Sequence, residues 1–189
     1  WITFNNFFRQ VSRTCLVALG MSLVIATGGI DISVGSAMAL GAVLAALGIV
    51  HQSPLLIILS IVLVIAFGCL AGVAVSKFAI LPMVVTLALR YVMRGMARGI
   101  SGAANVTYSA PKMTAFFTQP VIGQVPVHFF ILLAAVIVIY VVVNKMKLGA
   151  RIEAYGNNPV AARNCGINTV KIVIFCYAIT AALSWMAGM

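Results

Sequence analysis

Residues 55–70 read LLIILSIVLVIAFGCL and contain no charged side chain. This stretch belongs to a charge-free run of 45 residues at 32–76, and shorter runs cover 14–30, 113–144 and 172–189. About 20 apolar residues suffice for one helix to cross the hydrocarbon core of a bilayer. These runs therefore indicate a chain that lies mostly in lipid.

The composition favours helices over a barrel. Hydrophobic residues make up 63% of the chain and charged residues 7%, whereas charged residues make up about 25% of soluble domains. A backbone in lipid must satisfy its own hydrogen bonds, so it spans as helices or as a closed barrel. Barrel strands alternate polar and apolar residues, and 55–70 does not alternate. The sequence predicts an all-α polytopic membrane protein.

Interruptions of the apolar runs set the expected helices. The 45-residue run divides at the sequence HQSP, 51–54. Glycine costs a helix about 1 kcal/mol against alanine, so Gly28, Gly29 and Gly35 predict a break around 28–36. Residues 1–13 suit either a short helix in the headgroup region or the end of a longer helix. The expected spans are 14–30, 33–50, 55–76, 82–97, 127–144 and the start of a sixth at 172–189.

Small residues at helical spacing predict close contacts between helices, because they let two backbones approach. Such residues are the stripe Gly35, Ala39, Ala42 and Ala46, and the pair Gly68 and Gly72. A second pattern is the stripe Arg90, Arg94 and Arg98. It suits an anion path or a voltage sensor, but we favour side chains that reach the headgroups from a helix end. In the following loop, 99–126, residues 113–117 are expected to fold back onto the membrane surface.

Positive charge sets the expected orientation. Five cations and Glu153 give the segment 145–171 a net charge of +4, and positively charged loops stay in the cytoplasm. Counting back along the spans from this segment predicts the side of the membrane for the other links. Residues 99–126 and 51–54 would lie outside the cell, and residues 77–82 and Asp31 would lie at the cytoplasmic side. Arg9 and Arg13 then fall outside, against the rule, so the first two spans are alternatively one interrupted unit.

Several kinds of site are not expected. The net charge of +10 is spread over the ends of the spans, which argues against nucleic-acid binding. The four cysteines lack metal-ligand or CxxC spacing, so we expect no disulfide, no metal and no cofactor. No group of His, Cys and carboxylate residues suggests catalytic residues or an enzyme.

The polar segment 145–171 is predicted to hold a short helix at 159–165. Asn158 can cap it with a side-chain oxygen, Pro159 suits its first position, and Gly166 can end it in a left-handed conformation. Its sides would be formed by Ala161, Ala162, Arg163 and Asn164. From periodicity alone, a helix that docks into a partner and a loop without a partner remain equal alternatives.

Three ordered motifs resemble permeases of ABC importers of the ribose, xylose and galactose type. The first is similar to the family's cytoplasmic loop: Gly149-x-Arg151, Ala154-x-Gly156-x-Asn158, Ala161-Ala162 and Gly166-Ile167. The second, GGIDISVGS at 28–36, resembles the family's GGIDLSVGS. The third follows its proline, Thr-Leu and Arg-Gly pattern: Leu81-Pro82, Val85-Thr86-Leu87 and Arg94-Gly95. Arg90 stands near a place where the family has a small Gly-Thr pair, which leaves the cargo open.

The resemblance covers the whole chain and implies a permease subunit in the bacterial inner membrane. It would form half of a translocation pathway for a simple sugar or related small polar solute. The implied partners are an ABC ATPase subunit, a second permease subunit, identical or different, a periplasmic or lipid-anchored substrate-binding protein, and membrane lipid. Residues 1–189 would be a single transmembrane permease domain, a fragment with about six of an implied ten transmembrane helices. The chain has no GxxxxGK[ST] phosphate loop, so ATP hydrolysis is expected in a separate chain.

Two sets of residues are singled out. The coupling loop within 145–171 comprises Gly149, Arg151, Glu153, Gly156, Asn158, Ala161, Ala162, Arg163 and Gly166, in which Glu153 and Arg163 would form charge pairs with the ATPase. The membrane turn or pathway set comprises Gly28, Gly29, Asp31, Ser33, Gly35 and Ser36. A carboxylate in the membrane costs about 2.5–3.5 kcal/mol and needs a partner. Asp31 either lines the pathway or, as we favour, holds the turn by accepting from the Ser33, Gly35 or Ser36 amide.

The alternative function is an ion- or proton-coupled secondary carrier. Such a carrier needs ionisable groups in the membrane to bind the driving ion, and here only Asp31 offers a carboxylate for it. The sequence does not identify the residues that bind substrate.

Overall fold

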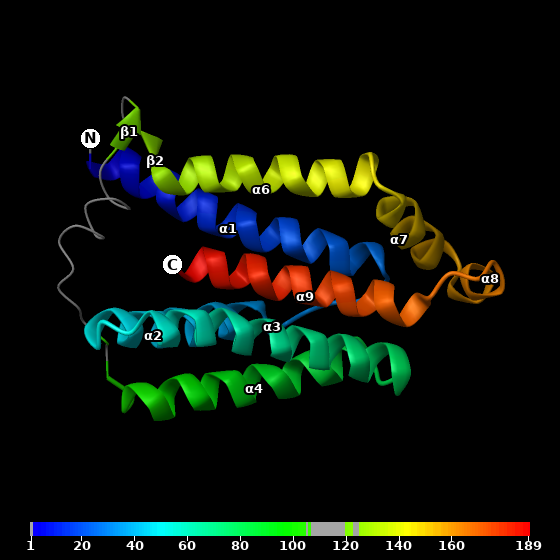
Figure 1. Cartoon of the computed structure of the whole chain (residues 1–189), viewed down its shortest axis with the longest axis horizontal. Coiled ribbons are helices and arrows are strands. Elements are labelled where there is room, and N and C mark those ends of the chain that lie inside the picture. The colour runs from blue at the N-terminus through cyan, green and yellow to red at the C-terminus, as the bar shows by residue number, and fades with distance from the viewer. Residues whose placement is uncertain (1, 105, 107–119, 123–124) are drawn as a thin grey trace.

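The computed structural model describes residues 2–104, 106, 120–122 and 125–189, and its long helices lie side by side along the longest axis (Figure 1). Helices α7 and α8 project at one end, here named the α8 end. A small hairpin and the N-terminus lie at the opposite end, here named the hairpin end. The elements are α1 (Ile2–Ala26), α2 (Val34–Val50), α3 (Pro54–Lys77), α4 (Pro82–Ser101), β1 (Pro120–Ile122), β2 (Val125–Pro126), α6 (Val127–Asn144), α7 (Lys147–Asn157), α8 (Pro159–Asn164) and α9 (Thr169–Gly188).

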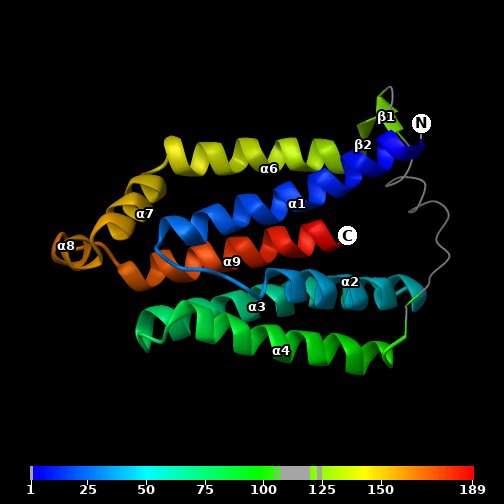
Figure 2. The same ribbon diagram turned by 180° about the vertical axis from the view of Figure 1, so that it is seen from behind.

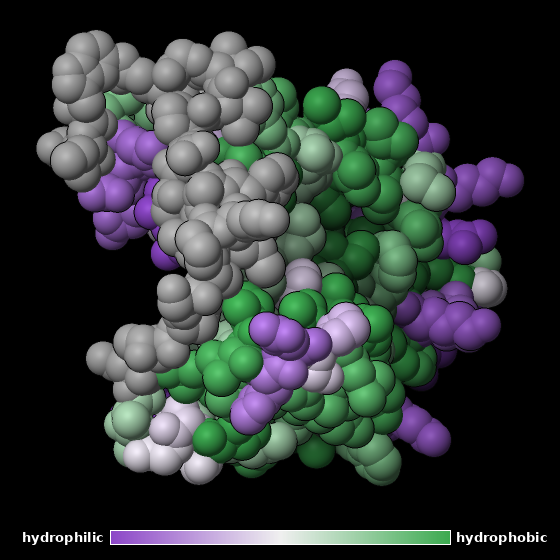
Figure 3. Space-filling model, turned by 60° about the vertical axis from the view of Figure 1, so that its left-hand side comes forward, coloured by the Kyte–Doolittle hydropathy of each residue, from purple (hydrophilic) through white to green (hydrophobic). Residues whose placement is uncertain are grey.

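Four of the described helices are long and apolar enough to cross a membrane: α1 from Phe4 onward, α3, α6 and α9. Helix α2 is apolar but has only 17 residues, and α4 falls outside this set because its 20 residues include three arginines. Large apolar areas cover the surface between hydrophilic groups (Figure 3). The expected all-α polytopic membrane protein is confirmed, with four candidate spans and one shorter apolar helix in the described residues.

The helices alternate between the two ends as predicted. The link between α3 and α4 lies at the α8 end, and the link between α2 and α3 lies at the hairpin end (Figures 1 and 2). After α1 ends, the segment 27–33 runs back into the bundle, where α2 begins partway along its length (Figure 2). The first two helices are thus a full-length helix and a shorter one. That the α8 end faces the cytoplasm remains a prediction.

Helix α9 lies at the centre of the bundle, where glycines allow close packing. A Cβ atom added to Gly68 would stand 2.7 Å from the Ala181 Cβ, and one on Gly72 would meet the Ile174 backbone. The predicted contact at Gly68 and Gly72 is confirmed, and the partner is α9. The Thr180 hydroxyl of α9 lies 2.8 Å from the Gly20 carbonyl oxygen of α1 and equally far from the Cys176 carbonyl oxygen of its own helix, so its proton can link α9 to α1.

Of the predicted small stripe on α2, only Ala46 is buried. Gly35 is exposed with open space around it, and Ala39 and Ala42 are half-buried. The close contacts of α2 are made instead by Gly41, next to the Trp185 side chain of α9, and by Gly48, next to α3. The contact face of α2 was predicted incorrectly because the spacing of small residues alone cannot show which side of an all-apolar helix meets its neighbours.

Several expected boundaries change. Helix α1 is continuous from Ile2, so the alternative of a longer helix holds and the expected start at residue 14 is wrong. It also ends at Ala26 rather than at residue 30. Helix α4 extends to Ser101, and a short hairpin of β1 and β2 follows within the expected loop. The expectation for residues 113–117 lies outside the described residues.

Candidate functional site

The polar segment 145–171 forms two helices, α7 and α8, of which only α8 was predicted. Helix α7 has 11 residues and one apolar side, with Ile152 buried at 4% exposure and Leu148 and Tyr155 half-buried. Their spacing of four and three residues was the signal that could have revealed this helix. The exposed charged side chains of α7 obscured it.

Two glycines join α7 to two membrane helices. A Cβ atom on Gly149 would overlap the carbonyl oxygen of Val143, in the last turn of α6. A Cβ atom on Gly156 would overlap the carbonyl oxygen of Ala26, the last residue of α1. These glycines therefore allow the backbone of α7 to approach the backbones of α6 and α1 closely. Helix α7 is seated against the ends of both helices.

Helix α8 is capped as the sequence predicted. The Asn158 side-chain oxygen accepts from the Val160 and Ala161 N–H groups, each at 3.0 Å. Gly166 follows the helix with a φ of 77°, a left-handed conformation that suits glycine. The helix ends at Asn164, one residue earlier than expected, with Cys165 as its cap.

The surface of α8 differs from the expected one. Ala162 is buried at 4% exposure, whereas Ala161 is exposed, so the two alanines do not form one smooth side. Val160 is 69% exposed, which leaves an apolar side chain at the tip of the segment. Glu153 and Arg163 are also exposed. Helix α8 thus offers an apolar tip with charged groups nearby, while its anchoring side is turned inward.

The Asp31 turn is held locally by one residue. Asp31 is 4% exposed, and its Oδ1 accepts from the Ser33 N–H at 2.8 Å and from the Ser33 hydroxyl at 2.6 Å. Of the three predicted amide donors, Ser33 donates to Asp31, whereas the Ser36 N–H donates to the Ser33 carbonyl at 2.9 Å. Gly28 has a φ of 75° at the turn after α1. The turn-holding role of Asp31 is consistent with these contacts.

Thr86 of α4 is a residue of this site that the sequence did not single out. It is fully buried, and its hydroxyl oxygen accepts from the Ile32 N–H at 3.2 Å. Its proton has three carbonyl acceptors within reach, those of Pro82 at 2.9 Å, Ile30 at 3.3 Å and Met83 at 3.4 Å. The hydroxyl thus meets the backbone on both sides of Asp31. The only sequence signal was its place in the Val85-Thr86-Leu87 motif.

A cavity of about 220 Å³ lies between the coupling segment and the turn that leads to Asp31. Its lining includes Tyr155 of α7, Thr27, Gly28 and Gly29, Tyr177 of α9, and residues 79–82, where the chain passes from α3 into α4. A Cβ atom on Gly29 would stand 2.8 Å from the Tyr177 hydroxyl oxygen. Two residues of the predicted turn set, Gly28 and Gly29, thus line this cavity together with Tyr155 of α7, whereas none of the predicted coupling residues lines it. Among the described residues, no cluster of three or more His, Cys, Asp or Glu side chains is placed to hold a metal ion.

These features define a multi-pass helical membrane protein whose polar segment is seated against the ends of its membrane helices. Residues 3–189 match the family described as branched-chain amino acid transport system / permease component, and the chain belongs to this family.

The chain is also similar to sugar permeases. It is 34% identical to the fructose import permease protein FruF of Bifidobacterium longum over 97% of this chain and 53% of the relative. It is 35% identical to the galactofuranose transporter permease protein YtfT of Escherichia coli, over 97% of this chain and 54% of that one. It is 33% identical to the ribose import permease protein RbsC of Escherichia coli, over 100% of this chain and 61% of that relative. The chain thus spans little more than half the length of these relatives. No solved structure matches it significantly.

Proposed function

We propose that this chain is part of the membrane-spanning permease subunit of an ATP-driven ABC importer for a simple sugar or related small polar solute. It would form half of the translocation pathway in a bacterial inner membrane, beside a second permease subunit. ATP hydrolysis would occur in a separate ATPase subunit, and a substrate-binding protein would deliver the solute. The relatives support the cargo class, because the proteins similar to this chain are named for fructose, galactofuranose and ribose.

The seating of α7 is the observation that supports coupling to an ATPase. Gly149 and Gly156 leave no space between α7 and the ends of α6 and α1. Val160 and Ala161 of α8, in contrast, are exposed at the tip. A partner that presses on this tip would displace α7, and α7 would then push on two membrane helices.

The mechanism follows from these contacts. Close-packed protein interiors transmit strain because they contain little free volume. A shift of α7 would reach α1 through the Ala26 carbonyl, and the segment after Ala26 leads directly into the Asp31 turn. Thr86 ties that turn to α4. Movement of the ATPase would therefore tilt α1 and α6 and open the pathway alternately to each side of the membrane.

The test is a pair of substitutions at the exposed Ala161. Ala161→Arg adds bulk and charge to the proposed docking surface without filling a packed site, and it should abolish the substrate-stimulated ATPase activity of the assembled transporter. Ala161→Ser keeps the surface small and should retain that activity. Equal ATPase activity in both variants, at equal membrane abundance, would reject the docking role.

A second measurement separates the importer from a secondary carrier. Uptake by an importer should stop when cellular ATP is depleted, and should persist when an uncoupler is added while ATP is maintained. Uptake that collapses with the uncoupler, and survives loss of the ATPase subunit, would favour a secondary carrier instead.

A further inference from the structure

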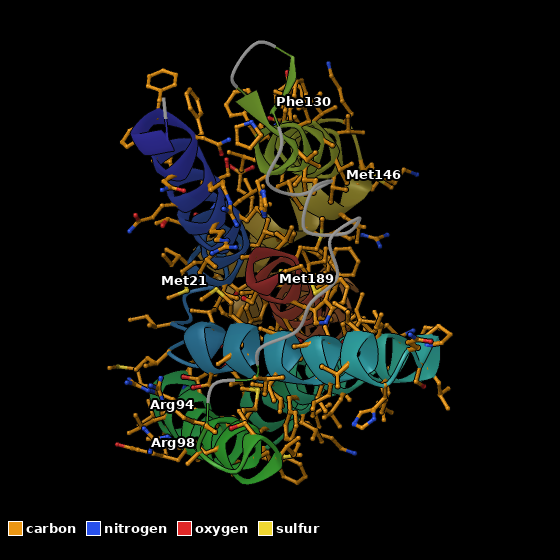
Figure 4. All side chains as sticks on the ribbon, turned by 90° about the vertical axis from the view of Figure 1, so that its left-hand side faces the viewer. Met21, Arg94, Arg98, Phe130, Met146 and Met189 are labelled. Carbon is orange, nitrogen blue, oxygen red and sulfur yellow. The ribbon has the colours of Figure 1, made fainter. Side chains whose placement is uncertain are left out.

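A groove of about 720 Å³ lies between α1 and α2, and the function proposed above does not yet use it. Met21 points into the space between these two helices (Figure 4). The polar residues that line the groove all come from α1, and they are Asn6, Arg9, Gln10, Arg13 and Thr14. Its apolar lining includes Val17, Ala18 and Met21 of α1 and Val34 and Met38 of α2.

The polar side chains form one continuous face of α1. Asn6, Gln10 and Thr14 follow one another at intervals of four residues, and residues at this spacing lie above one another on a helix. Arg9 and Arg13 run beside them with the same spacing. From Val17 onward the same face is apolar. The groove is therefore polar toward the hairpin end and apolar toward the middle of the bundle.

The depth of this face argues for a function. Helix α1 has 25 residues, and Arg13 lies one residue from its midpoint. Half of the helix is about 18 Å long at 1.5 Å per residue, so this arginine is not at a helix end. Charged residues inside a membrane helix are costly, and they typically face a pathway or a water-filled cavity.

The chemistry of the lining selects a class of solute. Amide groups both donate and accept hydrogen bonds, and guanidinium groups donate several in a fixed plane. Thr14 donates its proton to the Gln10 carbonyl at 3.0 Å, which leaves its oxygen free to accept. Neither Asp31 nor Glu153 lines the groove, so no carboxylate there would bind a cation. Hydroxyl groups fit this set, and the apolar half suits the C–H face of a sugar ring.

We propose that this groove is a binding site in the translocation pathway for an uncharged polyhydroxylated solute, with Asn6, Gln10 and Thr14 as its hydroxyl-binding residues. The proposal deepens the proposed function and rests on it for the solute class. Whether water and solute enter the groove is measured separately from transport. The groove proposal and the proposed importer function can therefore fail independently.

The test is thiol labelling of the full-length permease in membranes with a charged, membrane-impermeant reagent. The background carries Cys165→Ser, because Cys165 is exposed at the α8 end. Gln10→Cys reports on the groove, and Asn6→Cys provides a second position. The native Cys15 is exposed on α1 but does not line the groove, so it is the matched control. A thiol reacts as the thiolate and needs access to water, so Gln10→Cys should label about tenfold faster than Cys15.

Occupancy is then measured by protection. An excess of ribose, fructose or allose, delivered with the cognate binding protein in the assembled transporter, should slow labelling of Gln10→Cys, and a sugar phosphate should not. Labelling no faster than at Cys15 would overturn the groove as an aqueous pathway. Fast labelling without protection by any of these sugars, or with protection only by the sugar phosphate, would overturn the assigned solute class. Protected labelling in a transporter without ATP-dependent uptake would instead contradict the proposed function alone.

Discussion

Gly156 of α7 lies against the carbonyl oxygen of Ala26, the last residue of α1, so closely that no side chain fits between them. This contact places the proposed docking segment next to the residue from which the chain turns toward Asp31. The two glycine-rich motifs, more than 100 residues apart in the sequence, are therefore neighbours in the fold.

Gly156→Ala tests this contact directly. The added methyl group would overlap a backbone oxygen that cannot rotate away, so α7 must shift or the end of α1 must move. Overpacking of this kind costs about 1–3 kcal/mol. We expect a lower thermal unfolding midpoint of the purified protein and reduced substrate-stimulated ATPase activity. Gly99→Ala is the control, because nothing lies within 4 Å of its added Cβ; similar loss in both variants would contradict the proposed seating.

Thr86→Val should destabilise the Asp31 turn. Valine has nearly the same shape, but it leaves the Ile32 N–H without the hydroxyl that accepts from it. An unsatisfied buried donor costs about 1–3 kcal/mol. Thr86→Ser keeps the hydroxyl and should recover most of that loss, measured as the unfolding midpoint in detergent. A valine variant as stable as the serine variant would show that the hydroxyl does not hold the turn.

Substitutions of Asp31 separate a structural role from ion binding. Asp31→Asn keeps an oxygen that can accept from both Ser33 donors, so stability and uptake should stay close to those of the native protein. Asp31→Ala removes the acceptor of two hydrogen bonds, each with a net contribution of about 0.5–1.5 kcal/mol. It should lower the unfolding midpoint. Loss of uptake in Asp31→Asn at unchanged stability would favour an ion-binding carboxylate.

Gly72→Ala should weaken the packing of α3 on α9. Its added Cβ would stand 2.5 Å from the Ile174 Cα atom, so the helices must separate. Gly95→Ala has open space around it and, in a helix interior, should stabilise the protein by up to about 1 kcal/mol. The measurement is again the unfolding midpoint, and a stabilising effect at both positions would contradict the central packing of α9.

The elements predictable from sequence were those set by local chemistry. Charge-free runs located the apolar helices, Asn158 and Gly166 bounded α8, and the glycines before Asp31 marked the break. Helix α7 was missed because its three inward apolar residues lie among exposed charges. The contact face of α2 was misplaced because an all-apolar helix in lipid has no polar side to orient it.

The relations within the site required the fold. Nothing local indicates that Thr86 meets the backbone around Asp31, since they are 55 residues apart. When Arg9 and Arg13 were treated as loop residues, their predicted place on the external side of the membrane contradicted the rule that positively charged loops stay in the cytoplasm. In the structure, both line a groove between α1 and α2, which gives them a place other than a loop.

Site-directed cross-linking at the tip of α8 tests the docking claim most directly. A photoactivatable group attached to Val160→Cys, in the Cys165→Ser background, should cross-link the permease to its ATPase subunit in the assembled transporter. The same group on His51→Cys, exposed in the link between α2 and α3, should give no such product, because that link lies at the hairpin end. An ATPase adduct from Val160→Cys alone is the predicted result. No adduct from Val160→Cys, or equal adducts from both positions, would contradict the role of α8 as the docking element.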